Sequence, residues 1–194
     1  VSALEYFPGG YLMAACFTDG TIAILNEDLE DKQILKMTSP VSRLVTSPCE
    51  NYFVVADTTN VLAVVQLGPG KVADRWEVIG KYRAHACPIV SLMFTYAGED
   101  LHLTSVGKDG TLAEFNISQS NLEKGIVLEK HDSLHKGDSE PVAAVVVSSR
   151  EQPCSHESNI LVTADTNCKF LTYNLTQGCT TKMVLGPAFG GHIQ

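Results

Sequence analysis

The chain has 194 residues, of which 44% are hydrophobic and 19% charged, a composition that lets a globular protein bury a core. Its formal net charge of -8, without a visible cluster of Lys and Arg, argues against a nucleic-acid partner, because phosphate binding needs concentrated positive charge. No apolar run approaches the roughly 20 residues that a membrane span needs, so we expect no membrane partner either.

The first 84 residues predict two sheets of four short strands each. Short apolar runs are separated by Gly, Pro, Asn and Asp, which is typical of strands joined by tight turns. Because residue 1 is Val and the first residues already predict a strand, we expect a segment of a longer protein. Each predicted four-stranded sheet is called a blade. The strands predicted for a first blade, residues 1–38, are 1–7, 11–17, 21–26 and 32–37. Those predicted for a second blade, residues 39–84, are 41–46, 52–56, 61–67 and 76–82.

The most regular stretch is 85–117, which we take as the reference blade. Both faces of its first apolar run are largely hydrophobic, which is expected of a strand with sheets packed on both sides. Asp109-Gly110 is a strong hairpin signal, because Gly accepts positive φ without steric cost. The third blade, residues 85–138, has predicted strands at 89–94 and 101–106, a third that ends on Phe115, and an outer strand at 126–130.

The rest of the chain predicts a fourth blade at 139–187 and the start of a next segment at 188–194. Four blades leave both terminal strands without partners, which natural proteins avoid, so we expect part of a larger propeller. The main inserted loops are predicted between Ser118 and Glu140 and between Ser148 and Ser158, where a partner would bind. The predicted strands of the fourth blade are 142–147, 160–164, 170–175 and 182–185.

Spacings in the third blade resemble the WD40 repeat. In that family a His, a Ser or Thr, the Asp of the tight turn and a Trp form a hydrogen-bonded tetrad. His85, Ser105 and Asp109 match it, and Phe115 replaces the Trp, so the network should stop at Ser105. The implied role is structural, since a buried Asp needs its acceptors filled.

The same frame recurs in the fourth blade. Thr163, Asn167 and Tyr173 take the Ser, Asp and Trp positions there. The turn positions 19, 59, 109 and 167 recur at intervals that begin at the WD40 blade length, about 40 to 45 residues, and grow by insertion. The fold class expected is therefore all-β, a WD40-type β-propeller of about four four-stranded blades.

Other motifs favour plain structural interpretations, so we expect no enzyme, cofactor or metal. His131 and His135 have a metal-binding spacing but lie in a predicted charged loop, and Cys154 with His156 is a weaker pair. The acidic run 27–31 lacks the pattern of a calcium loop, and Trp76 is more consistent with strand packing than with an exposed anchor. The six dispersed cysteines favour free thiols over disulfides.

The second half of the chain is also similar to a family of ciliary WD-repeat proteins. The resemblance rests mainly on Leu-Gly-Pro-Ala-Phe-Gly at 185–190 and on Glu114-Phe115-Asn116. It implies a non-catalytic scaffold of the motile-cilium or flagellum axoneme, within the calmodulin- and spoke-associated complex at the radial spoke base on doublet microtubules. The alternative is a cytosolic WD40 adaptor, either a ubiquitin-ligase substrate receptor or a coat component. The Trp-Asp-x-Arg signature of many ligase receptors is absent, which lowers that option.

Overall fold

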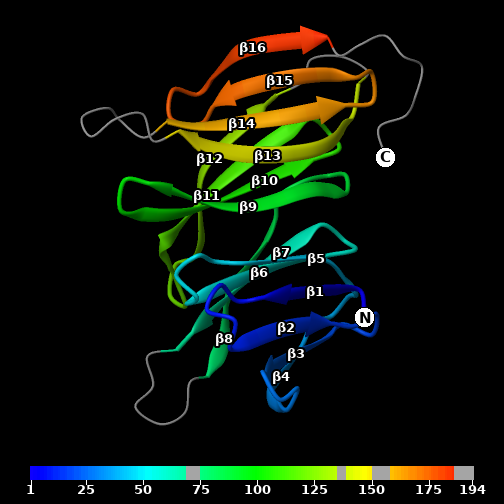
Figure 1. Ribbon diagram of the computed structural model, residues 1–194, viewed down its shortest axis with the longest axis vertical. Coiled ribbons are helices and arrows are strands. Elements are labelled where there is room, and N and C mark those ends of the chain that lie inside the picture. Colours follow the sequence, from blue (N-terminus) through cyan, green and yellow to red (C-terminus); the bar gives the residue numbers. More distant parts are fainter. Residues whose placement is uncertain (69–74, 135–138, 150–157, 186–194) are drawn as a thin grey trace. The chain divides into compact units, whose positions relative to one another are not determined.

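The computed structural model is all-β, and its described residues form four antiparallel sheets of four strands each (Figure 1). It describes residues 1–68, 75–134, 139–149 and 158–185, and these contain no helix. Within each sheet the strands follow chain order, each paired with its sequence neighbour. The predicted all-β, four-stranded blade architecture is thus confirmed, while residues 188–194, predicted to begin a next segment, lie outside the described part.

The first two sheets follow the alternation of short apolar runs and turns. The first contains β1 (Ala3–Tyr6), β2 (Leu12–Cys16), β3 (Thr21–Asn26) and β4 (Asp31–Lys36). The second contains β5 (Val41–Thr46), β6 (Tyr52–Asp57), β7 (Val61–Leu67) and β8 (Trp76–Arg83).

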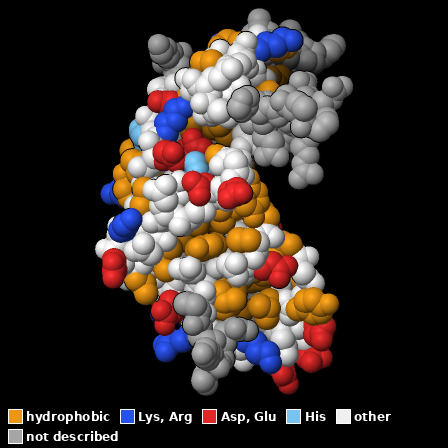
Figure 2. Space-filling model, turned by 90° about the vertical axis from the view of Figure 1, so that its left-hand side faces the viewer, with side chains coloured by type: hydrophobic (Ala, Val, Ile, Leu, Met, Phe, Trp, Pro, Cys, Tyr) orange, Lys and Arg blue, Asp and Glu red, His pale blue; other side chains and the backbone are white. Residues whose placement is uncertain are grey.

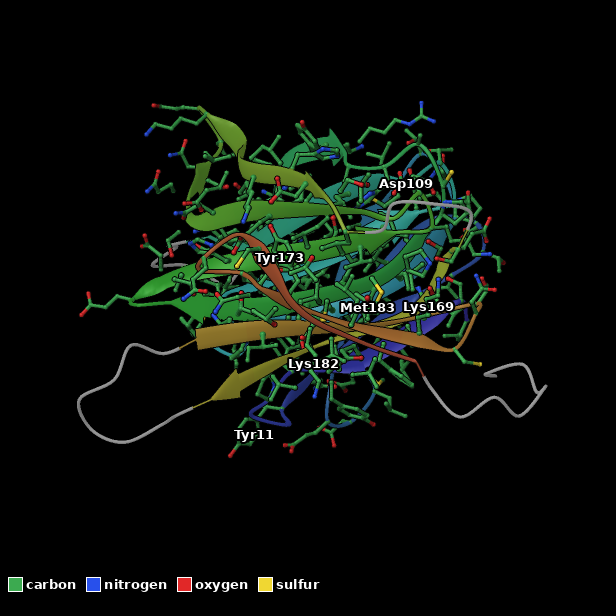
Figure 3. The ribbon with its side chains drawn as sticks, turned by 90° about the horizontal axis from the view of Figure 1, so that it is seen from above. Tyr11, Asp109, Lys169, Tyr173, Lys182 and Met183 are labelled. Atoms are coloured by element: carbon green, nitrogen blue, oxygen red, sulfur yellow. The ribbon has the colours of Figure 1, made fainter. Side chains whose placement is uncertain are left out.

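The third and fourth sheets are built in the same way from longer strands. The third contains β9 (Ile89–Ala97), β10 (Asp100–Gly107), β11 (Thr111–Asn121) and β12 (Gly125–Ser133). The fourth contains β13 (Pro141–Ser149), β14 (Ser158–Asp165), β15 (Lys169–Asn174) and β16 (Cys179–Leu185). Figure 3 shows Lys169 and Tyr173 on β15 and Lys182 and Met183 on β16.

The chain divides into two compact units, each with its own core. The first unit is Val1–Ala84 with Gln119–Val127, and the second is His85–Ser118 with Leu128–Gln194. In the first, Trp76 is only 3% exposed and lies 5.0 Å from the Phe7 ring and 5.1 Å from the Phe53 ring, between centroids. The prediction that Trp76 packs inside rather than standing exposed is confirmed.

The core of the second unit lies between the third and fourth sheets. Val106 and Leu112 from the third sheet pack against Leu161 and Leu171 from the fourth, and all four are essentially inaccessible to water. Such burial is worth about 1.5–3 kcal/mol for each side chain of this size. The two sheets are therefore joined by a continuous apolar contact at this end.

The turns between the second and third strands of the sheets are geometrically alike. The residue before each third strand has positive φ: 83° at Gly20, 65° at Asn60, 74° at Gly110 and 56° at Cys168. A left-handed residue at this place sets the register of the two flanking strands. The third strands of all four sheets therefore begin at equivalent points, although only two of these turns use Gly.

The region between Ser118 and Glu140 was predicted as an inserted loop around an outer strand at 126–130; that strand is present as β12, but both it and β11 extend into the predicted loop. Strands β11 and β12 continue to Asn121 and from Gly125, forming a long hairpin. Its strands alternate polar side chains that bond to the backbone: Ser118 Oγ accepts from the Leu101 amide, and Ser120 Oγ accepts from the Val127 amide. Apolar periodicity indicated the middle of β12 but not these polar extensions of the two strands. Residues 150–157, the core of the other predicted loop, lie outside the described part.

Candidate functional site

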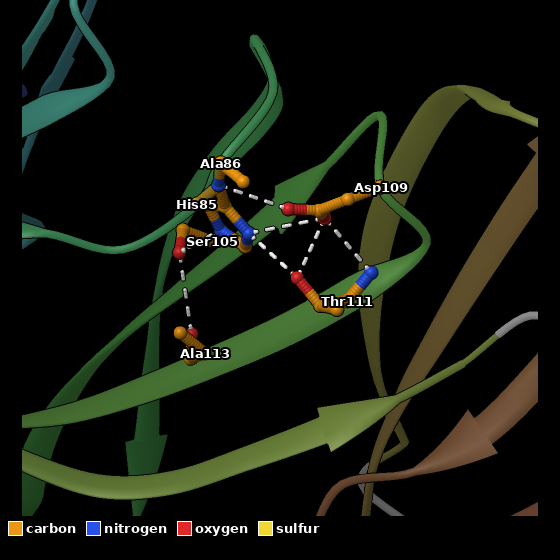
Figure 4. A network of polar contacts seen from close by, with 6 residues as sticks. All are labelled: His85, Ala86, Ser105, Asp109, Thr111 and Ala113. Carbon is orange, nitrogen blue, oxygen red and sulfur yellow. Dashed lines mark hydrogen bonds and ion pairs between the residues drawn. The ribbon is translucent and has the colours of Figure 1, made fainter.

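The predicted tetrad residues of the third sheet lie together around the imidazole of His85 (Figure 4). His85 Nε2 lies 2.8 Å from Ser105 Oγ, and His85 Nδ1 lies 2.8 Å from Thr111 Oγ1 and 3.4 Å from Asp109 Oδ1. Asp109 Oδ2 accepts a hydrogen bond from the Ala86 amide at 3.2 Å. The network therefore joins the segment before β9 to the β10–β11 turn.

One arrangement of protons satisfies these distances. The Thr111 hydroxyl donates to Asp109 Oδ1 at 2.6 Å, so its oxygen is free to accept from His85 Nδ1–H. The Ser105 hydroxyl then lies between two acceptors, His85 Nε2 at 2.8 Å and the Ala113 carbonyl oxygen at 3.5 Å. Burial holds the pKa of His85 below its usual value despite the nearby Asp109 carboxylate, which agrees with a neutral imidazole.

The order Ser105, His85, Asp109 is similar to that of a nucleophile, a base and an orienting acid, although Thr111 takes the hydrogen bond of His85 Nδ1 and Asp109 lies 3.4 Å away. Ser105, however, has no exposed surface, and His85 is only 3% exposed. A substrate carbonyl cannot reach a hydroxyl placed in this way. The arrangement can therefore hold a turn against a strand, and it offers no access for acyl transfer.

Two details differ from the sequence-based expectation. Asp109 is not buried: its side chain is 19% exposed, and Ser105 binds the other side of the imidazole instead of the carboxylate. Thr111, which was not predicted, supplies a hydroxyl and an amide to Asp109 Oδ1. Its signal is the spacing Asp-x-Thr, which also occurs at Asp19. Phe115 lies fully buried in β11, cross-strand from Leu103.

In the fourth sheet, the three equivalent positions occupy the expected elements. Thr163 is fully buried in β14, and Asn167 lies in the β14–β15 turn, where its amide donates to Asp165 Oδ1 at 2.9 Å. Tyr173 projects from β15, and its hydroxyl donates to Asp132 Oδ2 of β12. The side chain at the Trp position therefore ties the fourth sheet to the third.

A small polar cluster surrounds Tyr173. Lys130 Nζ lies 5.0 Å from the Tyr173 ring centroid and 3.3 Å from Asp132 Oδ2. The Tyr173 hydroxyl and Lys130 hold the pKa of Asp132 below its usual value. The predicted charged loop around His131 is corrected here: residues 131–133 belong to β12, and Leu134 is buried in the core. His135, the second His of that pair, lies outside the described residues.

His102 was not predicted to have a role, and it lies in a second polar cluster. On β10, its Nδ1 is 3.1 Å from Glu114 Oε1 of β11 and 3.4 Å from Glu129 Oε2 of β12. The hydrogen bond to Glu114 raises the pKa of His102, more than burial lowers it, and Glu129 and Asp100 add to the rise. His102 and Glu114 are both over nine-tenths buried.

Stability should depend on pH through His102. The raised pKa means that the folded chain holds this proton more tightly than the unfolded chain. The stabilising contribution is fully present below about pH 6.5 and is lost as pH rises through the folded-state pKa. We expect the difference in free energy of unfolding between wild type and His102→Gln to shrink with increasing pH.

Urea denaturation measures this difference at pH values from about 5 to about 9, in steps of about one pH unit. The control is His131→Gln, the same substitution at an exposed His of β12. A difference for His102→Gln that stays constant across the series contradicts the ion-pair interpretation.

A metal site and a membrane-spanning helix each have requirements with which the described residues can be compared. In the described ranges, no group of three or more His, Cys, Asp and Glu has the geometry to hold a metal ion. No helix among those residues is long and apolar enough to cross a membrane. Cys16, Cys49, Cys87, Cys168 and Cys179 form no disulfide within the part of the chain that the structure describes. On the face shown in Figure 2, Lys and Arg side chains stand scattered among acidic and apolar ones.

The sheets and their turn network define the chain as a WD-repeat β-propeller protein. An uncharacterized WD repeat-containing protein of Acanthamoeba polyphaga mimivirus is 31% identical over 101 residues, which cover 52% of this chain and 70% of that protein. The chain therefore belongs to the WD-repeat family. Within that family it is similar to cilia- and flagella-associated protein 251. No model of a protein family matches the chain.

The similarity to cilia- and flagella-associated protein 251 extends over the whole chain. The Mus musculus protein is 30% identical over 202 residues, covering 100% of this chain. The Chlamydomonas reinhardtii protein is 28% identical over 145 residues, covering 73%. The resemblance predicted from the sequence is confirmed, and it is not limited mainly to the second half. The chain spans only 15% and 18% of the lengths of these two relatives.

Proposed function

We propose that this chain is part of a non-catalytic scaffold of the motile cilium or flagellum axoneme. It would act at the radial spoke base, where it would bind proteins of the calmodulin- and spoke-associated complex and the doublet microtubule. Its mechanism would be rigid presentation of surface from stacked four-stranded sheets. The observation that carries the proposal is similarity along the entire chain to proteins named for cilia and flagella.

One structural observation and one comparison support a scaffold rather than an enzyme. The Ser-His-Asp arrangement of the third sheet is closed to substrate, because Ser105 has no exposed surface. The relatives, moreover, are named for association with an organelle and not for a reaction. Scattered surface charge also fits binding to proteins better than binding to a nucleic acid.

The proposal predicts co-purification with axonemes. Full-length protein carrying a small tag should remain with isolated axonemes after detergent removes the ciliary membrane, and should resist release by moderate salt. Immunoblotting of pellets and supernatants over a salt series measures retention. The control for trapped soluble protein is a fluorescent protein of similar size expressed in the same cells. It should appear in the detergent supernatant. A wholly cytosolic pool would refute the ciliary proposal and favour the cytosolic adaptor alternative.

A further inference from the structure

The interface between the third and fourth sheets contains a polar cavity at the end opposite its apolar core. The cavity has a volume of about 320 Å³. Its walls include His102, Glu114 and Glu129 from the third sheet, and Asn159 and Leu175 from the fourth sheet and the segment just after β15. This volume lies at the small end of ligand sites, about 300–1,000 Å³, and fits one long side chain better than a cofactor.

The sheet face that forms one wall carries more polar groups than packing requires. Thr95 is cross-strand from His102, and Thr104 is cross-strand from Glu114, so all four side chains point to the same side of the sheet. The Thr95 and Thr104 hydroxyls are over nine-tenths buried and have no hydrogen-bond partner among the described residues. Buried hydroxyls without a partner are uncommon on a sheet face built only for packing.

Two carboxylates line the cavity on either side of one imidazole. Glu114 and Glu129 contribute two carboxylates, and the imidazole between them supplies at most one positive charge. Lys130 also lines the cavity, but its ammonium is paired with Asp132 and lies over the Tyr173 ring, so it is engaged away from the two carboxylates. A cation is therefore favoured in the cavity over a neutral or anionic group.

The two carboxylates also define a direction of entry. The Glu129 side chain is 49% exposed, whereas the Glu114 side chain is 11% exposed, so the first marks the mouth and the second the floor. Ala97 and Leu175 supply apolar wall along the path. An occupant with an aliphatic stem and a cationic head fits this order of surfaces.

We propose that this cavity binds an arginine side chain of a partner protein. The guanidinium would donate to the carboxylate oxygens of Glu114 and Glu129 that His102 does not contact. Its planar group with several N–H donors suits carboxylates better than an ammonium does. The arginine methylenes would lie against Ala97 and Leu175. A divalent metal fits less well, because the His102 imidazole nitrogen already contacts both carboxylates.

The proposal deepens the scaffold function and rests on it, because it describes how a partner protein is recognised. The test does not depend on cilia, so the two can fail separately. The peptide acetyl-Gly-Gly-Arg-Gly-Gly-amide is titrated into the full-length protein, and binding is measured calorimetrically. Peptides with lysine or citrulline in place of arginine are compared. Arginine should bind saturably, and citrulline, which lacks the charge, should bind at least about tenfold more weakly.

Two variants locate the site. Glu114→Gln should weaken binding of the arginine peptide about tenfold, and Glu129→Gln, at the half-exposed mouth, should weaken it while keeping the fold. The matched control is Glu27→Gln, which makes the same change in an exposed turn. Equal binding of arginine and citrulline, or equal loss in the control, would overturn the assignment, whatever the outcome of axoneme co-purification.

Discussion

Replacement of Trp76 by alanine is expected to lower the free energy of unfolding by about 3–5 kcal/mol. Trp76 is buried between Phe7 and Phe53, so truncation removes two ring contacts and leaves a large cavity. Aromatic pairs in offset or tilted geometry add to the loss beyond buried area. Because Trp76 is the only Trp, unfolding must be followed by circular dichroism instead of tryptophan fluorescence.

Two further variants calibrate this result. Trp76→Phe should recover a large part of the loss, because it keeps a ring between Phe7 and Phe53. Tyr11→Ala removes an aromatic side chain that is 71% exposed and should change stability little. Comparable losses for Trp76→Ala and Tyr11→Ala would show that the ring cluster does not hold the first unit together.

Asp109→Ala is expected to destabilise the second unit by about 2–3 kcal/mol. The substitution leaves the Ala86 amide and the Thr111 amide without their acceptor and removes the carboxylate beside His85. Hydrogen bonds from Thr111 and Ala86 overcome the effect of burial and hold the pKa of Asp109 below its usual range. Thermal denaturation at neutral pH measures the change.

Companion variants separate this network from general charge effects. Thr111→Val keeps the shape of the side chain but removes the hydroxyl that links His85 to Asp109, so it should destabilise by a smaller amount. Asp28→Ala, in an exposed turn, makes the same substitution away from any such network and should be neutral. An unchanged melting temperature for Asp109→Ala would refute the structural role of the tetrad residues.

Turn chemistry made the fold predictable from the sequence. The strands of the first two sheets are short, and the turns between β2 and β3 and between β6 and β7 contain Asp, Asn or Gly, so alternation and turn signals coincide there. The extension of β11 to Asn121 was not predicted, because Ser118 and Ser120 occupy positions where an apolar residue would be expected. Their hydroxyls satisfy backbone amides within the sheet, which hydrophobic periodicity does not report.

The polar clusters were less predictable than the strands, for a physical reason. His85, Ser105 and Asp109 have fixed spacings within one blade, so the sequence brings them together. Asp132 and Tyr173 come from different blades, and their meeting depends on how two sheets pack. His102 and Glu114 lie on neighbouring strands but match no motif, and only the strand register places their side chains on one face.

The four equivalent turns show how a repeat can lose its consensus and keep its chemistry. In each sheet, an Asp Oδ1 accepts from the first amide of the third strand, at Thr21, Val61, Thr111 and Lys169. The four-residue turns, each closed by a hydrogen bond between its first and last residues, are 17–20, 57–60, 107–110 and 165–168. The Asp is the third residue of the turn at 19 and 109 but the first at 57 and 165. The four turns thus share a carboxylate oxygen that accepts from the first amide of the third strand, and the Asp that supplies it occupies one of two positions in the turn. A carboxylate can change position between copies in two substitutions, through a sequence that carries both, without the amide ever losing its acceptor.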